Sequence, residues 1–229
     1  METRSKPKPK KKKQQEQQKL YRYTSLPALF YILTNQKLTL LPYSLWDDKN
    51  DSYFLNQYKD KLELKTVLAL CFSTKPQTYH HWRVFAHGPA GVCITFDRQA
   101  IIDAIKEQEK KLQNGEMLFG REVTYMSTKT NSLKTEELPF IKRKAFQDEK
   151  EWRILYQFEC KEAECNRKET YDICIPISSI IHVTLSPWLP NALQQPLKDI
   201  IKKIDQCNKL VIFSSTILNN EKWRKLADM

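Results

Sequence analysis

Two acidic residues, Glu149 and Glu151, lie two positions apart in the segment KAFQDEKEWRI. Side chains two positions apart in a β-strand project from the same face, so we expect the two carboxylates to lie close together. Close carboxylates repel each other, and proteins relieve this repulsion with a cation, with a metal ion or by using the pair in catalysis. The alternative to a catalytic role is that Arg143, Lys144 or Arg153 neutralises the pair at the surface.

The segments that must position these acids alternate between strand-like and helix-like patterns. Residues 20–24 alternate as a strand does, and Ser25 followed by Pro27 marks the start of a helix that reaches about residue 36. The run TVLALCFS predicts a buried central strand, and EWRILYQFE alternates as a further strand after the acidic pair. Other strands are expected at residues 37–41, 91–97, 121–126, 180–186 and 209–215, and other helices at residues 53–62, 98–112, 136–146 and 191–204 and through Trp223.

Length and composition favour one globular domain. The chain has 229 residues, of which 41% are hydrophobic, and this is enough for a sizeable core. Short strands and helices alternate irregularly, and no internal repeat is present, so we predict an α+β (mixed α/β) fold class. We expect a single α+β domain over residues 20–229.

The first 19 residues differ in composition from the rest of the chain. They carry eight basic residues against two acidic ones, within a chain of net charge +11. Such a segment buries too little apolar surface to offset the entropy of ordering, so we expect a disordered basic tail over residues 1–19. The densest run is Lys10, Lys11, Lys12 and Lys13. This run would bind nucleic acid through its phosphates, or serve as a nuclear-import address in a eukaryotic host; a solubilising arm without a partner is the alternative.

Glycine content and the longest uncharged stretch argue against several protein classes. The four glycines cannot form a phosphate-binding loop or a dinucleotide fingerprint, which argues against a P-loop nucleotidase and a Rossmann dehydrogenase. The longest uncharged stretch, residues 173–197, contains four prolines and several polar residues, so no membrane span is expected.

Cysteine usage indicates a reducing compartment. The chain has six cysteines and no secretion signal, so we expect reduced thiols and a cytoplasmic location. Cys71, Cys93 and Cys174 lie within apolar runs and are expected to be small core residues rather than metal ligands.

Several separated motifs resemble one bacterial protein family. They are LYRYTSLPALFYILTNQKLTLLPYSLWDDKNDSYF, LALCFS followed by HHWRVFAHGPAGVCITFD, FIKRKAFQDEKEWRI, and IIHVTLSPW followed by KLVIFSS. In this order they resemble the bacterial domain-of-unknown-function 2971 family, over nearly the whole chain from about Leu20. The chain departs from the family between Trp46 and Asp51, where an Asn-Asp-Pro type of loop is usual. Because this family has no settled activity, the resemblance predicts no chemistry by itself.

The order of the polar residues is also similar to that of the ADP-ribosyltransferase superfamily. Arg22 lies on the first strand, in YRYT, and Ser73 follows Phe72 at the end of the central strand. Glu149 and Glu151 then form a Glu-x-Glu near a later strand. The resemblance implies a split, ADP-ribosyltransferase-like sheet flanked by helices, with NAD as co-substrate and no metal ion.

This second resemblance assigns a role to each polar side chain. Glu151 would stabilise the oxocarbenium-like centre that forms when the nicotinamide–ribose bond breaks, and Glu149 would orient or deprotonate the acceptor. Arg22 would hold the pyrophosphate or ribose through its guanidinium, and Ser73 would position the nicotinamide end. Aromatic faces for the bases would come from Tyr21, Tyr23 and Trp82.

Two other classes of function remain open. One is a metal-dependent nuclease, in which acidic side chains hold Mg²⁺. Its ligands would be Asp47, Asp48, Asp51, Glu149 and Glu151. The other is a non-catalytic nucleic-acid-binding module that acts through the basic tail. Zinc is not expected, because His80, His81 and His87 are not accompanied by a Cys-x-x-Cys pattern.

The sequence therefore predicts an NAD-dependent ADP-ribosyltransferase or NAD-cleaving enzyme. Its acceptor would be a protein, a nucleic acid or water, and a toxin or phage-defence setting is consistent with the family resemblance.

Overall fold

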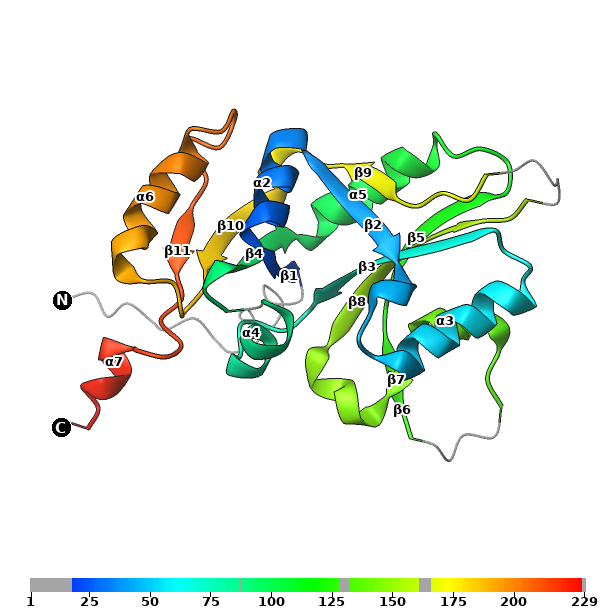
Figure 1. The fold of residues 1–229 in the computed structure, drawn as a ribbon, viewed down its shortest axis with the longest axis horizontal. Coiled ribbons are helices and arrows are strands. Elements are labelled where there is room, and N and C mark those ends of the chain that lie inside the picture. Colours follow the sequence, from blue (N-terminus) through cyan, green and yellow to red (C-terminus); the bar gives the residue numbers. More distant parts are fainter. Residues whose placement is uncertain (1–17, 87, 128–131, 161–165, 228–229) are drawn as a thin grey trace, which may run out of the picture.

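A computed structural model describes residues 18–86, 88–127, 132–160 and 166–227 of the chain (Figure 1). Within these residues, nine strands form one large, mostly antiparallel sheet and two form a small parallel pair. The large sheet comprises β1 (Lys19–Ser25), β2 (Lys37–Pro42), β3 (Thr66–Ser73), β4 (Gly91–Asp97), β5 (Glu116–Glu122), β8 (Glu151–Phe158), β9 (Tyr171–Cys174), β10 (Ile180–Leu185) and β11 (Ile212–Ser214). The small pair comprises β6 (Thr124–Met126) and β7 (Ile141–Arg143).

Helices flank the sheet and connect its strands. The α-helices are α2 (Leu26–Asn35), α3 (Lys49–Lys61), α4 (Tyr79–Phe85), α5 (Arg98–Glu109), α6 (Asn191–Lys202) and α7 (Glu221–Arg224). Short 3₁₀ turns are η1 (Tyr43–Leu45), η2 (Gly88–Ala90), η3 (Thr135–Phe140), η4 (Lys144–Glu149) and η5 (Ile177–Ser179). The predicted mixed α/β class, with a sheet flanked by helices, is confirmed.

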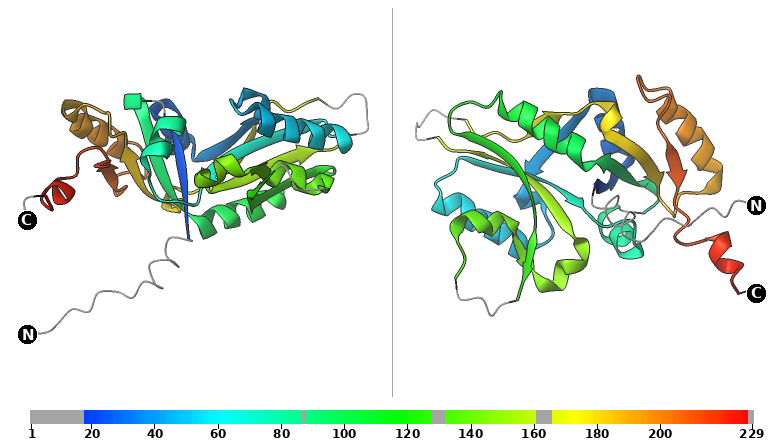
Figure 2. Two further views of the ribbon diagram at one scale, coloured as in Figure 1. Left: turned by 90° about the horizontal axis from the view of Figure 1, so that it is seen from below. Right: turned by 180° about the vertical axis from the view of Figure 1, so that it is seen from behind.

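The large sheet divides at β3. One edge of β3 pairs along its whole length with β8, and the other edge is shared between β2 and β1. Only one register pair, Tyr21↔Ser73, joins β1 to β3, whereas β1 pairs with β4 from end to end. In the view from below in Figure 2, β1 and β4 accordingly run steeply across the direction of β3 and β8. The predicted split of the sheet lies at this junction.

Both faces of the sheet are covered by helices. Side chains of α2, α5 and α6 pack with one face of β1, β3, β4 and β8 in the largest core cluster. The opposite face packs with α3 through Leu55 and Tyr58, and with α4 through Trp82 and the following residue, Ala86. Strand β8 is therefore buried on both faces, although its sequence alternates as a half-buried strand would.

Local signals explain where the first helix begins and ends. The Ser25 hydroxyl accepts a hydrogen bond from the Ala28 amide, and Pro27 occupies the first turn, where its missing N–H costs nothing. Gln36 adopts left-handed backbone angles and donates its N–H to the Ile32 carbonyl, which closes the helix. Asp97 caps α5 in the predicted way, by accepting from the Ala100 amide.

Several expectations from the sequence are wrong. The predicted helix over residues 136–146 is instead η3, β7 and η4, because Pro139 lacks an amide donor and Ile141–Arg143 pair with β6. The strand predicted at residues 121–126 is divided between β5 and β6, and β9 was not predicted. Cys174 is exposed rather than in the core, and Cys160 is disulfide-bonded rather than reduced.

The tail and the domain boundary stay predictions. Residues 1–17, which include the run Lys10–Lys13, lie outside the described part of the chain, and β1 begins at Lys19. None of the helices in the described residues combines the length and the hydrophobicity of a transmembrane segment.

Gly120 on β5 permits a close contact that holds β5 and α5 against β8. A Cβ atom at this position would lie 2.4 Å from Cζ2 of the buried Trp152 ring and 3.3 Å from Cδ1 of Ile105. We expect Gly120→Ala to lower the free energy of unfolding by about 1–3 kcal/mol, measured by urea denaturation, because neither neighbour can move freely. The matched control Met117→Ala, on an exposed side chain of β5, is expected to change it by less than about 0.5 kcal/mol. Equal stability of Gly120→Ala and the wild type would contradict this packing.

Candidate functional site

Three strands place residues from three separate motifs in one row. Ser73, the last residue of β3, pairs with Tyr21 of β1 on one side and with Glu151, the first residue of β8, on the other. Partners in register project from the same face of a sheet. The topology therefore brings Ser73 and Glu151 together from positions 78 residues apart in the sequence.

The acidic pair converges on one ammonium group. Glu149 ends η4, Lys150 turns the chain with left-handed backbone angles (φ 47°), and β8 begins at Glu151. Both carboxylates contact Lys142 of β7, whose Nζ lies 2.6 Å from Oε2 of Glu149 and 3.3 Å from Oε2 of Glu151. Asp51 of α3 is the third acid, with Oδ2 3.5 Å from the same nitrogen.

Arg153 supplies the second positive charge. Its Nη1 and Nη2 donate to the two carboxylate oxygens of Asp51 at 3.0 and 2.7 Å, and its Nε donates to Oε1 of Glu151 at 2.7 Å. It also donates to the Pro139 carbonyl at 2.6 Å and lies 4.6 Å from the centre of the Trp46 ring. A guanidinium has the geometry for such forked contacts, and a buried one requires them.

We call Asp51, Lys142, Glu149, Glu151 and Arg153 the buried charge cluster. Three negative and two positive groups leave it with one excess negative charge when all are ionised. Arg153 does neutralise one member of the acidic pair, as the alternative to catalysis expected. The neutralisation is not at the surface, however, because Glu149 and Glu151 are only 7% and 6% exposed. Lys142, which the sequence did not single out, is the other partner.

The pKa values of the two glutamates are shifted in opposite directions. Burial alone would raise the pKa of Glu151, but Arg153 and Lys142 outweigh burial and lower it to about 2. Burial raises the pKa of Glu149, and Lys142 offsets this only in part. Burial likewise raises the pKa of Asp51 despite its contact with Arg153. Environments that separate the pKa values of neighbouring carboxyls are typical of acid/base sites.

His81 joins Ser73 to the backbone of the acidic segment, and sequence reasoning considered it only as a zinc ligand. Its Nε2 donates to the Glu149 carbonyl at 3.2 Å and lies 3.2 Å from the Ser73 hydroxyl, which donates to the same carbonyl at 2.7 Å. Thr78, the N-cap of α4, contacts the other ring nitrogen. Burial lowers the pKa of His81, so the ring is neutral near pH 7. The Thr-x-x-His spacing at a helix start was the available signal.

Arg22 lies apart from this group. It alternates with Tyr21 and Tyr23 along β1, so its side chain leaves the strand from the opposite face. Its Nη1 donates to the Cys71 carbonyl at 2.7 Å, and burial lowers the pKa of the guanidinium. Arg22 therefore projects from the opposite face of the sheet to Ser73 and Glu151, which are register partners.

The predicted aromatic faces are covered by protein. Tyr21 and Tyr23 of β1 and Trp82 of α4 belong to one buried core cluster, in which Trp82 is fully buried. Tyr23 stacks on the His81 ring, with centroids 5.4 Å apart and an interplanar angle of 24°, and Trp82 packs edge-on against Tyr23. That these rings stack on bases stays a prediction; in this structure Tyr23 packs against His81 and Trp82 of α4.

The proposed magnesium ligands do not form an open cation site. Asp48 caps α3 by accepting from the amides of Asn50 and Asp51, while Asp47 is exposed. Asp51, Glu149 and Glu151 do converge, but the Lys142 ammonium takes the space between them. Within the described ranges, no group of three or more His, Cys, Asp or Glu is arranged to hold a metal ion.

Comparison with protein families gives one match. The profile of the family described as "Protein of unknown function (DUF2971)" matches residues 81–154. This match confirms the resemblance to the family over these residues. The matched segment contains His81 and every member of the buried charge cluster except Asp51.

Comparison with solved structures gives a distant likeness. DarT from Thermus sp. 2.9, solved in complex with ADP-ribosylated ssDNA, is 11% identical, and the alignment covers 87% of this chain and 95% of that chain with a TM-score of 0.42. The same protein in complex with NAD+ is 12% identical, with 87% and 96% covered and a TM-score of 0.42. No curated protein sequence matches the chain.

Because the pKa values of Glu149 and Glu151 are shifted in opposite directions, we expect Gln substitutions at the two positions to have different effects on stability. Because the pKa of Glu151 is lowered in the folded state, its ionised form stabilises the protein above pH 4.5, and this contribution is lost as pH falls from about 4.5 to about 2. We expect Glu151→Gln to lower the free energy of unfolding by about 2–3 kcal/mol at pH 7, with a smaller loss near pH 3.

Glu149→Gln is the matched control. Because the pKa of Glu149 is raised in the folded state, its ionisation opposes folding at pH 7, and the neutral amide can still accept the Lys142 hydrogen bond. We expect this variant to be as stable as the wild type or more stable at pH 7, by urea denaturation. Equal losses for the two variants would contradict the assigned acidities.

Proposed function

We propose that this protein cleaves the nicotinamide–ribose bond of NAD and transfers ADP-ribose to an acceptor. The observation that carries the proposal is the row in which Ser73 and Glu151 are register partners, with Glu149 beside them. Within this row, the pKa of Glu151 is lowered and that of Glu149 is raised. A carboxylate that stabilises positive charge on the sugar, next to a second carboxylate whose raised pKa makes it a stronger base, is a combination that glycosyl transfer to an acceptor hydroxyl can use.

The two glutamates divide the chemistry between them. As the glycosidic C–N bond breaks, its electron pair leaves with neutral nicotinamide, and positive charge develops on the ribose. Glu151, which stays ionised at neutral pH, stabilises that charge electrostatically. Glu149 accepts the proton of the acceptor hydroxyl as its oxygen bonds to the ribose carbon, which its raised pKa favours. With water as acceptor, the product is free ADP-ribose.

The supporting residues hold this pair in place. Ser73 and His81 both donate to the Glu149 carbonyl, so they fix the turn that carries the pair into β8. The excess negative charge of the cluster suits the positively charged nicotinamide end of NAD. That Arg22 holds the pyrophosphate stays a prediction.

Substrate access requires a rearrangement of the cluster. Lys142 contacts all three carboxylates, and its side chain is 9% exposed, so it closes the cluster on the side of β7. We include in the proposal that Lys142 moves away from Glu151 when the ribose enters, since both cannot occupy the same side of the carboxylate.

An anionic acceptor fits the charge of the chain. A net charge of +11 attracts nucleic acid at long range, so a nucleic-acid acceptor is favoured over a neutral one. The metal-dependent nuclease is the weaker candidate, because Lys142 neutralises the three acids that would bind the ion.

The test is incubation of the full chain with NAD labelled on the adenosine half, in cell lysate and with purified single-stranded DNA. We expect nicotinamide release and transfer of label to a macromolecular fraction, and loss of at least about 100-fold in Glu151→Gln because transition-state charge is no longer stabilised. Glu149→Gln should reduce label transfer more than nicotinamide release. EDTA should leave the reaction unchanged.

Controls separate chemistry from folding. Glu137→Gln replaces an exposed acid in the first turn of η3 and is expected to keep wild-type activity. Circular dichroism at the assay temperature confirms that each variant is folded. Absence of nicotinamide release from folded wild-type protein, or full activity of folded Glu151→Gln, would overturn the proposal; DNA degradation abolished by EDTA would favour the nuclease.

A further inference from the structure

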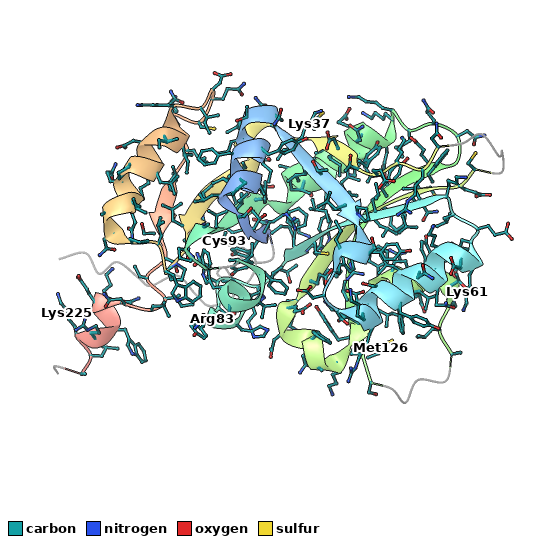
Figure 3. The ribbon with its side chains drawn as sticks, in the orientation of Figure 1. Lys37, Lys61, Arg83, Cys93, Met126 and Lys225 are labelled. Carbon is teal, nitrogen blue, oxygen red and sulfur yellow. The ribbon has the colours of Figure 1, made fainter. Side chains whose placement is uncertain are left out.

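A cavity of about 230 Å³ opens beside the buried charge cluster. It lies between the start of α3 and the pair β6–β7, near Met126 in Figure 3. Asp51 and Lys142 form part of its wall, so the cavity shares two residues with the cluster. The candidate catalytic carboxylates Glu149 and Glu151 are not part of the wall.

The remaining wall is largely apolar. Phe54 of α3, Met126 of β6 and Ile141 of β7 line the cavity. Ligand pockets usually have volumes of about 300–1,000 Å³, so this one suits a molecule with a single ring. An apolar wall containing an aromatic face favours a flat ligand body.

The charge around the cavity is unbalanced. With all five groups ionised, the cluster behind the wall carries one excess negative charge. Asp48 and Arg143 also line the cavity with opposite charges. The Oδ2 atom of Asp48 is buried and finds no hydrogen-bond partner in the described part of the chain. A neutral or anionic ligand would leave this excess in place, whereas a single positive charge would compensate it.

We propose that this cavity binds a small aromatic monocation of the pyridinium class, with its charge towards Asp51 and its ring against Phe54. The attraction of a cation to an aromatic face adds to the electrostatic term. Because Asp51 and Lys142 are shared with the cluster, the bound cation lies beside Lys142, which also contacts Glu151. The proposal does not depend on NAD cleavage.

The test compares two probes that differ by one methyl group and one charge, N-methylnicotinamide cation and nicotinamide. Titration of the full chain by calorimetry is expected to show the cation binding at least about tenfold more tightly than the neutral amide. In protein labelled with ¹³C at the methionine methyls, the cation should shift the Met126 resonance and leave that of Met117, an exposed residue of β5, unchanged.

Two variants on one helix complete the test. Phe54→Leu keeps an apolar side chain but removes the aromatic face, and we expect about threefold to tenfold weaker binding of the cation. Tyr53→Leu, at an exposed position of the same helix, should bind as the wild type does. Absence of saturable binding, equal affinity for the two probes, or binding without a shift at Met126 would overturn the proposal. All three outcomes are measured on the wild-type protein, so they do not depend on whether a variant folds. Neither probe is a substrate for NAD cleavage, so this test and the activity test can fail separately.

Discussion

The fully buried guanidinium of Arg153 is the constraint on which the candidate site depends. Removing one partner of a buried ion pair costs about 3–5 kcal/mol, so the fold must hold carboxylates against this group. Asp51 comes from α3, Glu151 from the strand that carries Arg153, and the Pro139 carbonyl from η3. One side chain thus fixes the start of α3, the turn before β7 and the entry to β8. The same contacts hold Glu151 ionised, which is the property that the proposed chemistry uses.

The division of the sheet places this constraint next to residues from the other half of the molecule. Because β3 pairs with β8 along one edge and with β1 at one register pair, the end of β3 is the point where the two halves meet. Ser73 occupies that point, and His81 ties it to the Glu149 backbone from α4. Helices α3 and α4 each reach the acidic segment, α3 through Asp51 and its contacts with Lys142 and Arg153, and α4 through His81 and the Glu149 carbonyl. Structural requirements and proposed function therefore converge on the same few residues.

Local patterns predicted most of the elements, because caps, prolines and apolar runs act within a few residues. The Ser25 cap, the buried run of β3 and the acidic pair at the start of β8 could all be read from neighbouring residues. The cluster could not, because Asp51 and Arg153 are 102 residues apart and their pairing depends on the packing of α3. Lys142 was missed since its segment was assigned to a helix, whereas β6 and β7 make it a strand. The different faces of Arg22 and Tyr21 follow from strand alternation, and only the register showed which of the two shares a face with Ser73.

NAD cleavage at Glu151 requires Lys142 to move away so that the ribose can reach the carboxylate. A crystal structure of the wild-type chain with a hydrolysis-resistant NAD analogue tests this requirement most directly. We expect the nicotinamide-bearing ribose next to the Glu151 carboxylate, with the Arg153–Glu151 pair intact and the Lys142–Glu151 contact broken. An analogue bound elsewhere, with the buried charge cluster paired as it is here, would contradict this expectation. So would the absence of binding at millimolar analogue.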